Sequence, residues 1–413
     1  MKVLFLLVVA MSLSRAHAAA QANVVPIDRE ALVFSASVAG GYDDDVTSGT
    51  AAPSGNPLFR TGGSFVMSDL GMSYAVQGRR VSLSAGAGSS IRFYRAVETF
   101  TADTYGGSIG VSAAVTRRLR VAANAAASRS SHYTLSLLPA FSENALEQTV
   151  VPSLDYSLTA ADLTRYHSGA QISYNLTKRS TASVYYSLTE STADNLFGVK
   201  SASWGGRFTQ GLTRYATLRL GYGKQEASYT SPVRQISAVD TYDIGVDYAR
   251  PLSFSRRTTV RVSAGTAFFE ARNRTHGTVI GQAALRHRVS RDWNLTATFI
   301  RGVGFIEGFA EPMLTDSVVS HLEGTIHPRV TVRGTLGYGN GGSDIQMPDG
   351  PRYRTYTTGV RTMFALYRGL FAFSEYVFYH YEFEQLSPLH RGAPRQLNRQ
   401  GIRSGLIYNV PIL

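Results

Sequence analysis

Apolar and polar residues alternate along most of this chain. In segment 260–268, valine, alanine and phenylalanine occupy most even positions, whereas Arg261 and small residues occupy the odd ones. Segments 81–93 and 330–338 repeat this pattern. Successive side chains of a β-strand point to opposite faces, so each segment predicts a strand with one apolar and one polar face.

Short connections alternate with long ones, and this decides between two all-β architectures. The long connections, such as 131–161 and 340–351, are rich in Gly, Pro or Asp. A soluble sandwich would rarely place arginine in the middle of so many strands. Short turns at one end and long loops at the other are typical of an outer-membrane barrel. The short connections are mostly basic and lie near residues 78–80, 116–118, 177–180, 210–213, 251–257, 290–292, 327–329 and 367–369.

The chain is therefore predicted to be an all-β protein, a transmembrane antiparallel up-and-down β-barrel of about eighteen strands. Both ends of the barrel segment should lie on the short-turn side, which faces the periplasm in such proteins. The expected strands cover residues 31–42, 62–77, 80–94, 104–116, 119–130, 163–176, 181–190, 199–210, 214–228, 239–249, 257–270, 275–289, 292–304, 314–326, 329–339, 352–366, 369–383 and 399–412.

The first residues have the layout of a secretory signal peptide. Lys2 precedes an apolar run from Val3 to Met11, and small residues follow at 18–22. The run is too short to span a membrane as a helix, and no later window is apolar for the roughly 18 residues that a spanning helix needs. We expect a cleaved signal peptide at 1–22, a short periplasmic leader at 23–30, and one barrel domain at 31–413, located in a bacterial outer membrane.

Composition narrows the class further. The chain has no cysteine, which excludes disulfides and thiolate metal sites. Charged residues make up 17% of the sequence, below the quarter or so of soluble domains, yet the formal net charge is +12. The arginines are scattered along strands rather than clustered, so nucleic acid is not expected as a partner.

Aromatic residues recur on the apolar face of successive strands. Membrane barrels place such residues in girdles at both interfaces, where an apolar ring with a polar edge is stable. A buried soluble core is the alternative for any single one. The residues in question are Trp204, Phe208, Tyr215, Tyr222, Tyr242, Tyr248, Phe268, Trp293, Phe299, Tyr338 and Tyr356.

The polar faces define a candidate lumen. An arginine facing lipid at mid-depth would cost about 2–4 kcal/mol, so arginines within strands should face water. We expect about a third of them to pair with acids and brace the wall. The rest would make the pore positive and favour anions. The expected pore-lining residues are Arg92, Arg120, Arg207, Arg219, Arg261, Arg286, Arg288, Arg333, Arg361, Arg403, Asp69, Asp243, Asp247 and Glu323.

The sequence offers no catalytic or metal-binding cluster. His-Glu-x-x-His does not occur, and His167, His321 and His380 are isolated. Gly106-Gly107-Ser108-Ile109-Gly110 has the spacing of Gly-x-Ser-x-Gly, but it lies inside the expected strand 104–116 rather than at a strand-to-helix turn. The acidic run 43–45 matches no calcium loop and is interpreted as a solvated tip, with cation binding as the alternative. We expect no enzymatic activity, no cofactor and no metal.

Two segments carry a resemblance to a known family. Ser35-Ala36-Ser37-Val38-Ala39-Gly40-Gly41-Tyr42-Asp43-Asp44-Asp45-Val46 resembles the N-terminal signature of the β-barrel porin 2 family, with Asp45 where an asparagine is common. The hairpin 173–184, followed by Thr189-Glu190-Ser191-Thr192, is similar to that family's central hairpin. The resemblance implies an exopolysaccharide-associated outer-membrane conduit of similar strand number.

The sequence thus predicts a porin-like conduit for polar or anionic solutes, linked through the resemblance to exopolysaccharide export. Expected partners are membrane lipid, the solute or polysaccharide, and periplasmic export components. Sugar binding would need inward aromatic residues, for which Tyr94, Tyr105 and Tyr185 are candidates. The alternatives are a non-conducting structural or adhesive barrel, plugged by the 131–161 loop, and an outer-membrane barrel enzyme.

Overall fold

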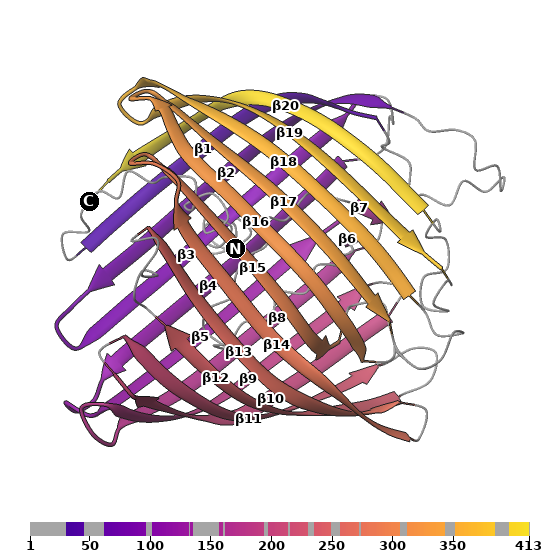
Figure 1. The fold of residues 1–413 in the computed structure, drawn as a ribbon. Helices are drawn as coiled ribbons and strands as arrows, with labels where there is room; N and C mark the ends of the chain where they lie inside the picture. Colours follow the sequence, from indigo (N-terminus) through magenta and orange to yellow (C-terminus); the bar gives the residue numbers. More distant parts are fainter. Residues whose placement is uncertain are drawn as a thin grey trace, which may run out of the picture.

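The chain folds into one closed antiparallel β-barrel, here described from a computed structural model (Figure 1). Its main sheet has 18 strands, as the alternation predicts. No helix among the residues described below is long and apolar enough to cross a membrane. The structure describes residues 30–44, 62–95, 101–131, 133–134, 157–159, 162–193, 197–213, 215–229, 235–248, 257–271, 274–305, 312–342, 352–384 and 396–412.

The strand bounds agree with the sequence-based ranges to within a few residues. The largest difference is at β12, which begins at residue 235 rather than 239. The barrel strands are β1 (Glu30–Asp43), β2 (Gly63–Gln77), β3 (Val81–Tyr94), β4 (Thr101–Ala114), β5 (Leu119–Ser130), β8 (Leu163–Asn175), β9 (Ser180–Ala193), β10 (Phe197–Gly211), β11 (Ala216–Tyr229), β12 (Gln235–Tyr248), β13 (Thr258–Ala271), β14 (Arg274–Arg288), β15 (Trp293–Gly304), β16 (Met313–His327), β17 (Val330–Gly342), β18 (Arg352–Tyr367), β19 (Leu370–Phe383) and β20 (Gln396–Pro411).

Each barrel strand pairs with the next one along the chain, and β1 pairs with β20 to close the barrel. Closure leaves the 18-stranded sheet without an edge strand. The sequence did not predict the two-stranded sheet of β6 (Tyr133–Thr134) and β7 (Ser157–Thr159), which lies between β5 and β8. The signal peptide (1–22), most of the leader (23–30) and most of the 131–161 loop lie outside the described residues.

The outer face of the barrel carries large, exposed apolar side chains. Val38, Ile109, Val262 and Leu336 are 49–62% exposed although each lies within a strand. Soluble proteins rarely expose apolar patches above a few hundred Å², whereas here such side chains recur from strand to strand. The apolar face of the alternating pattern is therefore the outside of the barrel, and the polar face is the inside.

Aromatic rings of neighbouring strands meet on this outer face. Trp204, Tyr222, Tyr242 and Phe268 form a continuous series across β10 to β13, with ring centroids 5.1–6.0 Å apart. Further around the barrel, the ring centroids of Tyr338 on β17 and Tyr356 on β18 are 5.2 Å apart. All six share a face with exposed aliphatic residues, as the girdle interpretation requires.

The inner face is not polar throughout. At the end of the barrel where the long loops begin, Tyr229, Tyr353, Tyr379, Tyr381 and Phe383 belong to one buried cluster. Each is at most 4% exposed, and each lies on the inner-face parity of its strand. We call these five residues the aromatic collar. It places packed rings on the inner face at that end of the barrel.

Candidate pore lining

The structure places all fourteen sequence-predicted lining residues on the inner face. Directly paired residues of neighbouring strands share a face, so the register relates one position to the next. Arg207 pairs with Gly221, and Asp243 pairs with Gly221 from the other side. When the register is followed from strand to strand around the barrel, every one of the fourteen residues falls on the face opposite the exposed aliphatic residues. That these residues line a conducting pore stays a prediction.

Five charged residues form a single row across adjacent strands β16 to β20. Glu323 pairs in register with Arg333, Arg333 with Arg361, Arg361 with Glu375, and Glu375 with Arg403. We call them the charged row. Neighbouring strands are about 4.8 Å apart, so the row extends over roughly 19 Å of wall.

Ion pairs within the charged row are well formed. Arg333 Nη2 donates to Glu323 Oε2 at 2.7 Å, and Arg403 Nε donates to Glu375 Oε2 at 2.9 Å. Arg361 Nη1 lies 4.0 Å from the same Glu375 oxygen, and its guanidinium carbon is 4.7 Å from the centre of the Phe373 ring. Glu375 thus serves two arginines. The row carries three cations and two anions, which leaves one surplus positive charge.

A second cluster lies on β11 to β13. Arg219 Nε is 3.3 Å from Asp243 Oδ2, and Arg219 Nη1 is 3.8 Å from Asp247 Oδ2. Arg261 Nε is 3.2 Å from Asp247 Oδ1. Arg219 is 3% exposed although it belongs to the inner face. This cluster is electrically balanced, with two arginines and two aspartates.

Glycines let these long side chains lie flat against the wall. A Cβ at Gly245 would sit 2.8 Å from Arg219 Nη2, and a Cβ at Gly205 or Gly223 would be 2.6 Å from the Tyr185 hydroxyl. Only glycine permits so close an approach at these positions. Arg219 and Tyr185 therefore lie against the backbone of neighbouring strands.

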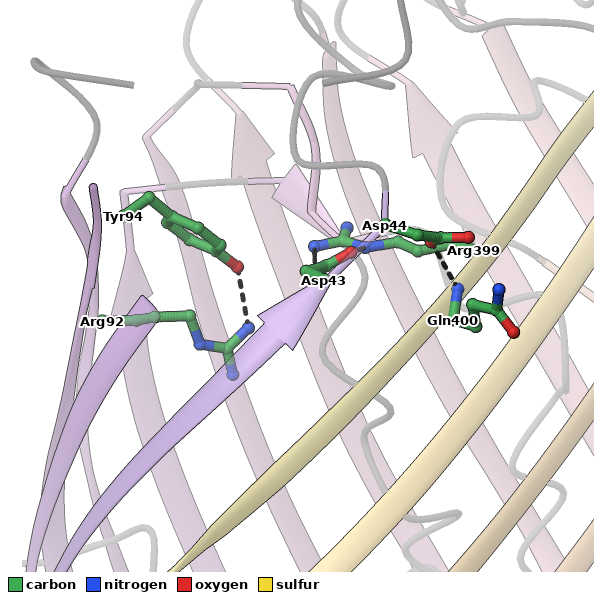
Figure 2. A network of polar contacts seen from close by, with 6 residues as sticks. All are labelled: Asp43, Asp44, Arg92, Tyr94, Arg399 and Gln400. Carbon is green, nitrogen blue, oxygen red and sulfur yellow. Dashed lines mark hydrogen bonds and ion pairs between the residues drawn. The ribbon is translucent and has the colours of Figure 1, made fainter. Parts of the chain in front are cut away.

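The closing seam holds a buried ion pair that the sequence did not reveal. Arg399 Nε donates to Asp43 Oδ1 at 2.9 Å, with further contact through Arg399 Nη2 (Figure 2). Arg399 and Asp43 are 2% and 5% exposed. The interpretation of run 43–45 as a solvated acidic tip is thus wrong for Asp43, because barrel closure brings an arginine of β20 beside it. Asp45 lies outside the described residues.

Two more contacts surround this pair in Figure 2. Asp44 Oδ1 accepts a bond of 2.7 Å from the backbone N–H of Gln400, again joining β1 to β20. Arg92 Nη1 donates to the Tyr94 hydroxyl at 3.1 Å. Outside the figure, the Arg92 guanidinium carbon is 4.9 Å from the centre of the Phe65 ring. The acids therefore fasten the seam rather than form an open cation site.

At least five of the ten expected arginines are in ion pairs among the described residues, so pairing is more extensive than the expected third. They are Arg219, Arg261, Arg333, Arg361 and Arg403. Strand register brings them beside acids from neighbouring strands, a relation that a single strand's pattern does not contain. Arg120, Arg286 and Arg288 are exposed, lie near the short turns and have no ion pair within the described part of the chain. Arg207 lies within β10, in register with Ser183 of β9.

Several inner-face charges were missed. Arg165, Glu375, Asp43 and Arg399 follow the inner parity of their strands. Extending the strict alternation to every strand end would have found them. Asp69, which was expected, accepts a 2.6 Å hydrogen bond from Ser37 Oγ across β1 and β2.

The three tyrosines that were expected to face inward, Tyr94, Tyr105 and Tyr185, differ in where they lie. Tyr94 is on the inner face but 1% exposed, and Tyr185 lies on the wall as described. Tyr105 is on the outer face, because it shares parity with Ile109 and pairs with the outward-facing Arg129. The prediction for Tyr105 is wrong, and no exposed row of inward rings exists at these three positions.

The histidines are separate from one another. The Nδ1 atoms of His167, His321 and His380 contact Thr189, Thr335 and Asn398, at 3.1, 3.2 and 2.5 Å. His380 is on the outer face, in register with Tyr356. Within the described ranges, no group of three His, Asp or Glu residues is placed to hold a metal ion.

Comparison with known proteins gives likeness in architecture only. No family model matches the chain, and no curated protein matches it. Among solved structures, the chain is similar to Pseudomonas aeruginosa OpdQ (TM-score 0.49, 9% identity, 93% of this chain and 98% of that one). It is also similar to Acinetobacter baumannii OccAB3 (TM-score 0.46, 11% identity, 93% and 99%) and to the FrpB iron transporter from Neisseria meningitidis (TM-score 0.46, 8% identity, 93% and 82%). The resemblance to the β-barrel porin 2 family therefore stays a prediction.

Proposed function

We propose that this protein is an outer-membrane channel that passes polar solutes and prefers anions. The observation that carries the proposal is the distribution of charge between the two faces of a closed barrel. The outer face is belted by exposed aliphatic and aromatic side chains, which suits lipid. The inner face carries more arginines than acids, and basic side chains lining a pore favour anions.

The surplus charge is concentrated toward the short-turn end. The Arg219 cluster is balanced and the charged row has one surplus cation, whereas Arg120, Arg286 and Arg288 are exposed without an ion pair among the described residues. Low-dielectric walls strengthen the field of such charges inside a narrow lumen. An anion entering from this end would meet unneutralised guanidinium groups before it reached the paired ones.

The proposal includes secretion of this protein across the inner membrane and its orientation in the outer membrane. Residues 1–22 would be removed as a signal peptide, and the short turns would face the periplasm. Export of an exopolysaccharide, with periplasmic export components as partners, is the finer version and rests on the family resemblance. The few exposed inward rings argue for recognition of a polysaccharide by its charge and hydroxyl groups rather than by ring stacking.

A structural barrel is the second candidate, and the aromatic collar favours it. Packed rings at one end of the lumen would limit or prevent passage. Liposome swelling separates the two candidates. Vesicles containing the refolded protein should swell faster in a small organic anion than in a cation of similar size. Absence of swelling with every solute would favour the structural barrel, and faster swelling in the cation would overturn the anion preference.

The same assay addresses the polysaccharide. Swelling in acidic oligosaccharides of increasing length would define the largest solute that passes. Exclusion of disaccharides together with passage of small anions would restrict the function to small solutes and remove the export version.

A further inference from the structure

The short turns carry a concentration of positive charge that solute passage does not explain. Ten exposed basic residues lie in the described parts of these turns, and Asp292 is the one acid among the same turn residues. We call them the basic rim. Its members are Arg79, Arg80, Arg117, Arg118, Lys178, Arg179, Arg257, Arg291, Arg329 and Arg368.

The rim charges have no carboxylate partners among the described residues, in contrast to some bases elsewhere on the outer face. No member of the basic rim has an ion pair within the described residues. Near the opposite end, Lys200 pairs with Glu190 at 3.7 Å, and Arg301 pairs with Asp316 at 3.2 Å. Carboxylates thus neutralise some outward bases near the long-loop end, whereas every base of the basic rim is left for an external anion within the described residues.

The turn backbone holds these bases at the tips. In two of the turns that carry rim residues, a threonine hydroxyl accepts bonds from backbone N–H groups that follow it. Thr177 Oγ1 accepts from Arg179 at 3.1 Å and from Ser180 at 3.0 Å, and Thr116 Oγ1 accepts from Arg118 at 3.2 Å. These local bonds close the turn without using the basic side chains, which leaves the cations exposed.

Exposed apolar residues accompany the cations at the same level. Val115 and Leu176 immediately precede the two threonine turns, and Val289, Ile326 and Tyr367 occupy equivalent places in others; all are 46–78% exposed. An apolar residue beside a long basic side chain suits the boundary of a bilayer, where the first contacts acyl chains and the second reaches the headgroups. A soluble anionic partner would have no use for the apolar residues.

The positions of the rim residues around the barrel also favour a lipid bilayer as the binding partner. The rim residues come from turns after β2, β4, β8, β14, β16 and β18, and from the position just before β13. These connections lie around the barrel rather than in one sector, because consecutive strands are neighbours. A single protein partner would contact one sector, whereas a lipid leaflet surrounds the whole circumference.

We propose that the basic rim binds the phosphate groups of anionic phospholipids in the leaflet at the short-turn end. The inference rests on the proposed membrane placement but not on conduction. Each basic residue near an anionic membrane surface strengthens binding by roughly fivefold, so loss of three should weaken it by about a hundredfold. The interaction should also weaken as salt rises, because the sites are exposed.

The test compares two triple variants of the full chain, each refolded in a neutral detergent. Arg80→Gln, Arg118→Gln and Arg179→Gln remove three rim charges. Lys200→Gln, Lys224→Gln and Arg354→Gln remove three outward charges at the other end and serve as the matched control. Native mass spectrometry would count retained phosphatidylglycerol and phosphatidylcholine across a lipid titration.

We expect the unmodified protein and the control to retain phosphatidylglycerol at least tenfold better than phosphatidylcholine, and the rim variant to lose this preference. Equal retention of both lipids by the unmodified protein, or equal loss in the control, would overturn the proposal. If the glutamine variant does not fold, the variant Arg80→Lys, Arg118→Lys and Arg179→Lys keeps the charge, and it must keep the preference. Rim-dependent sedimentation with peptidoglycan, combined with unchanged lipid retention, would assign the rim to that polymer instead. Swelling assays on the same preparations keep this result separate from the proposed channel function.

Discussion

Ile109 and Ser108 are adjacent residues on opposite faces of β4, and they offer a direct test of which face meets lipid. Ile109 is 54% exposed on the outer face, near the middle of the strand, and pairs in register with Ala85 and Ala125. Ser108 is on the inner face and pairs with Gly86 and Ala126. Both sites have small neighbours, so an introduced arginine meets little steric hindrance at either.

Ile109→Arg should destabilise the folded barrel by about 2–4 kcal/mol, the cost of a guanidinium near the bilayer midplane. That corresponds to a loss of about 30-fold to several-hundredfold in the ratio of folded to unfolded protein. Ser108→Arg should change stability by no more than about 0.5 kcal/mol, because its side chain enters a hydrated lumen. Reversible urea unfolding in lipid vesicles, followed by the fluorescence of the two tryptophans, measures both. Equal losses would refute the assignment of faces, and a larger loss for Ser108→Arg would invert it.

Three further predictions follow from the inner-face contacts. Arg399→Ala leaves Asp43 buried without its partner and should cost about 3–5 kcal/mol in the same unfolding assay, whereas the double variant with Asp43→Ala should recover part of that loss; full stability of the single variant would show that the seam pair is dispensable. Glu375→Gln removes the carboxylate shared by Arg361 and Arg403, so single-channel recordings should show stronger anion preference; unchanged selectivity would mean that the charged row does not face the ion path. Gly245→Val would place carbon within 2.8 Å of Arg219 Nη2 and push that side chain off the wall, which should lower conductance, whereas Gly359→Val, whose nearest contact is 3.7 Å away, should not.

The architecture could be predicted because lipid-facing and lumen-facing residues alternate along each strand of a membrane barrel. The outer residues of each strand must be apolar and the inner ones need not be, so strand number and bounds follow from alternation and turn spacing. β6 and β7 were missed because strands of two and three residues are too short to show a period.

Contacts between strands were harder to predict than faces. Glu375 stands in an aromatic stretch of β19, and its role depends on the register that brings Arg361 and Arg403 beside it. Asp43 lies 356 residues from Arg399 in the chain, and only closure of the barrel joins them. Tyr105 is a different case, since its parity with Ile109 was readable in the sequence and the outward assignment should have followed.

Reversal potential in a planar bilayer is the most direct test of an anion-preferring channel. The refolded protein would be recorded under a tenfold potassium chloride gradient, first at low and then at high salt. We expect discrete conductance and a reversal potential of the sign set by chloride. The preference for chloride should weaken at high salt, because the screening length shortens to roughly 3 Å at 1 M. A reversal potential set by potassium would contradict the electrostatic reasoning from the inner-face arginines, and absence of conductance would contradict the channel itself.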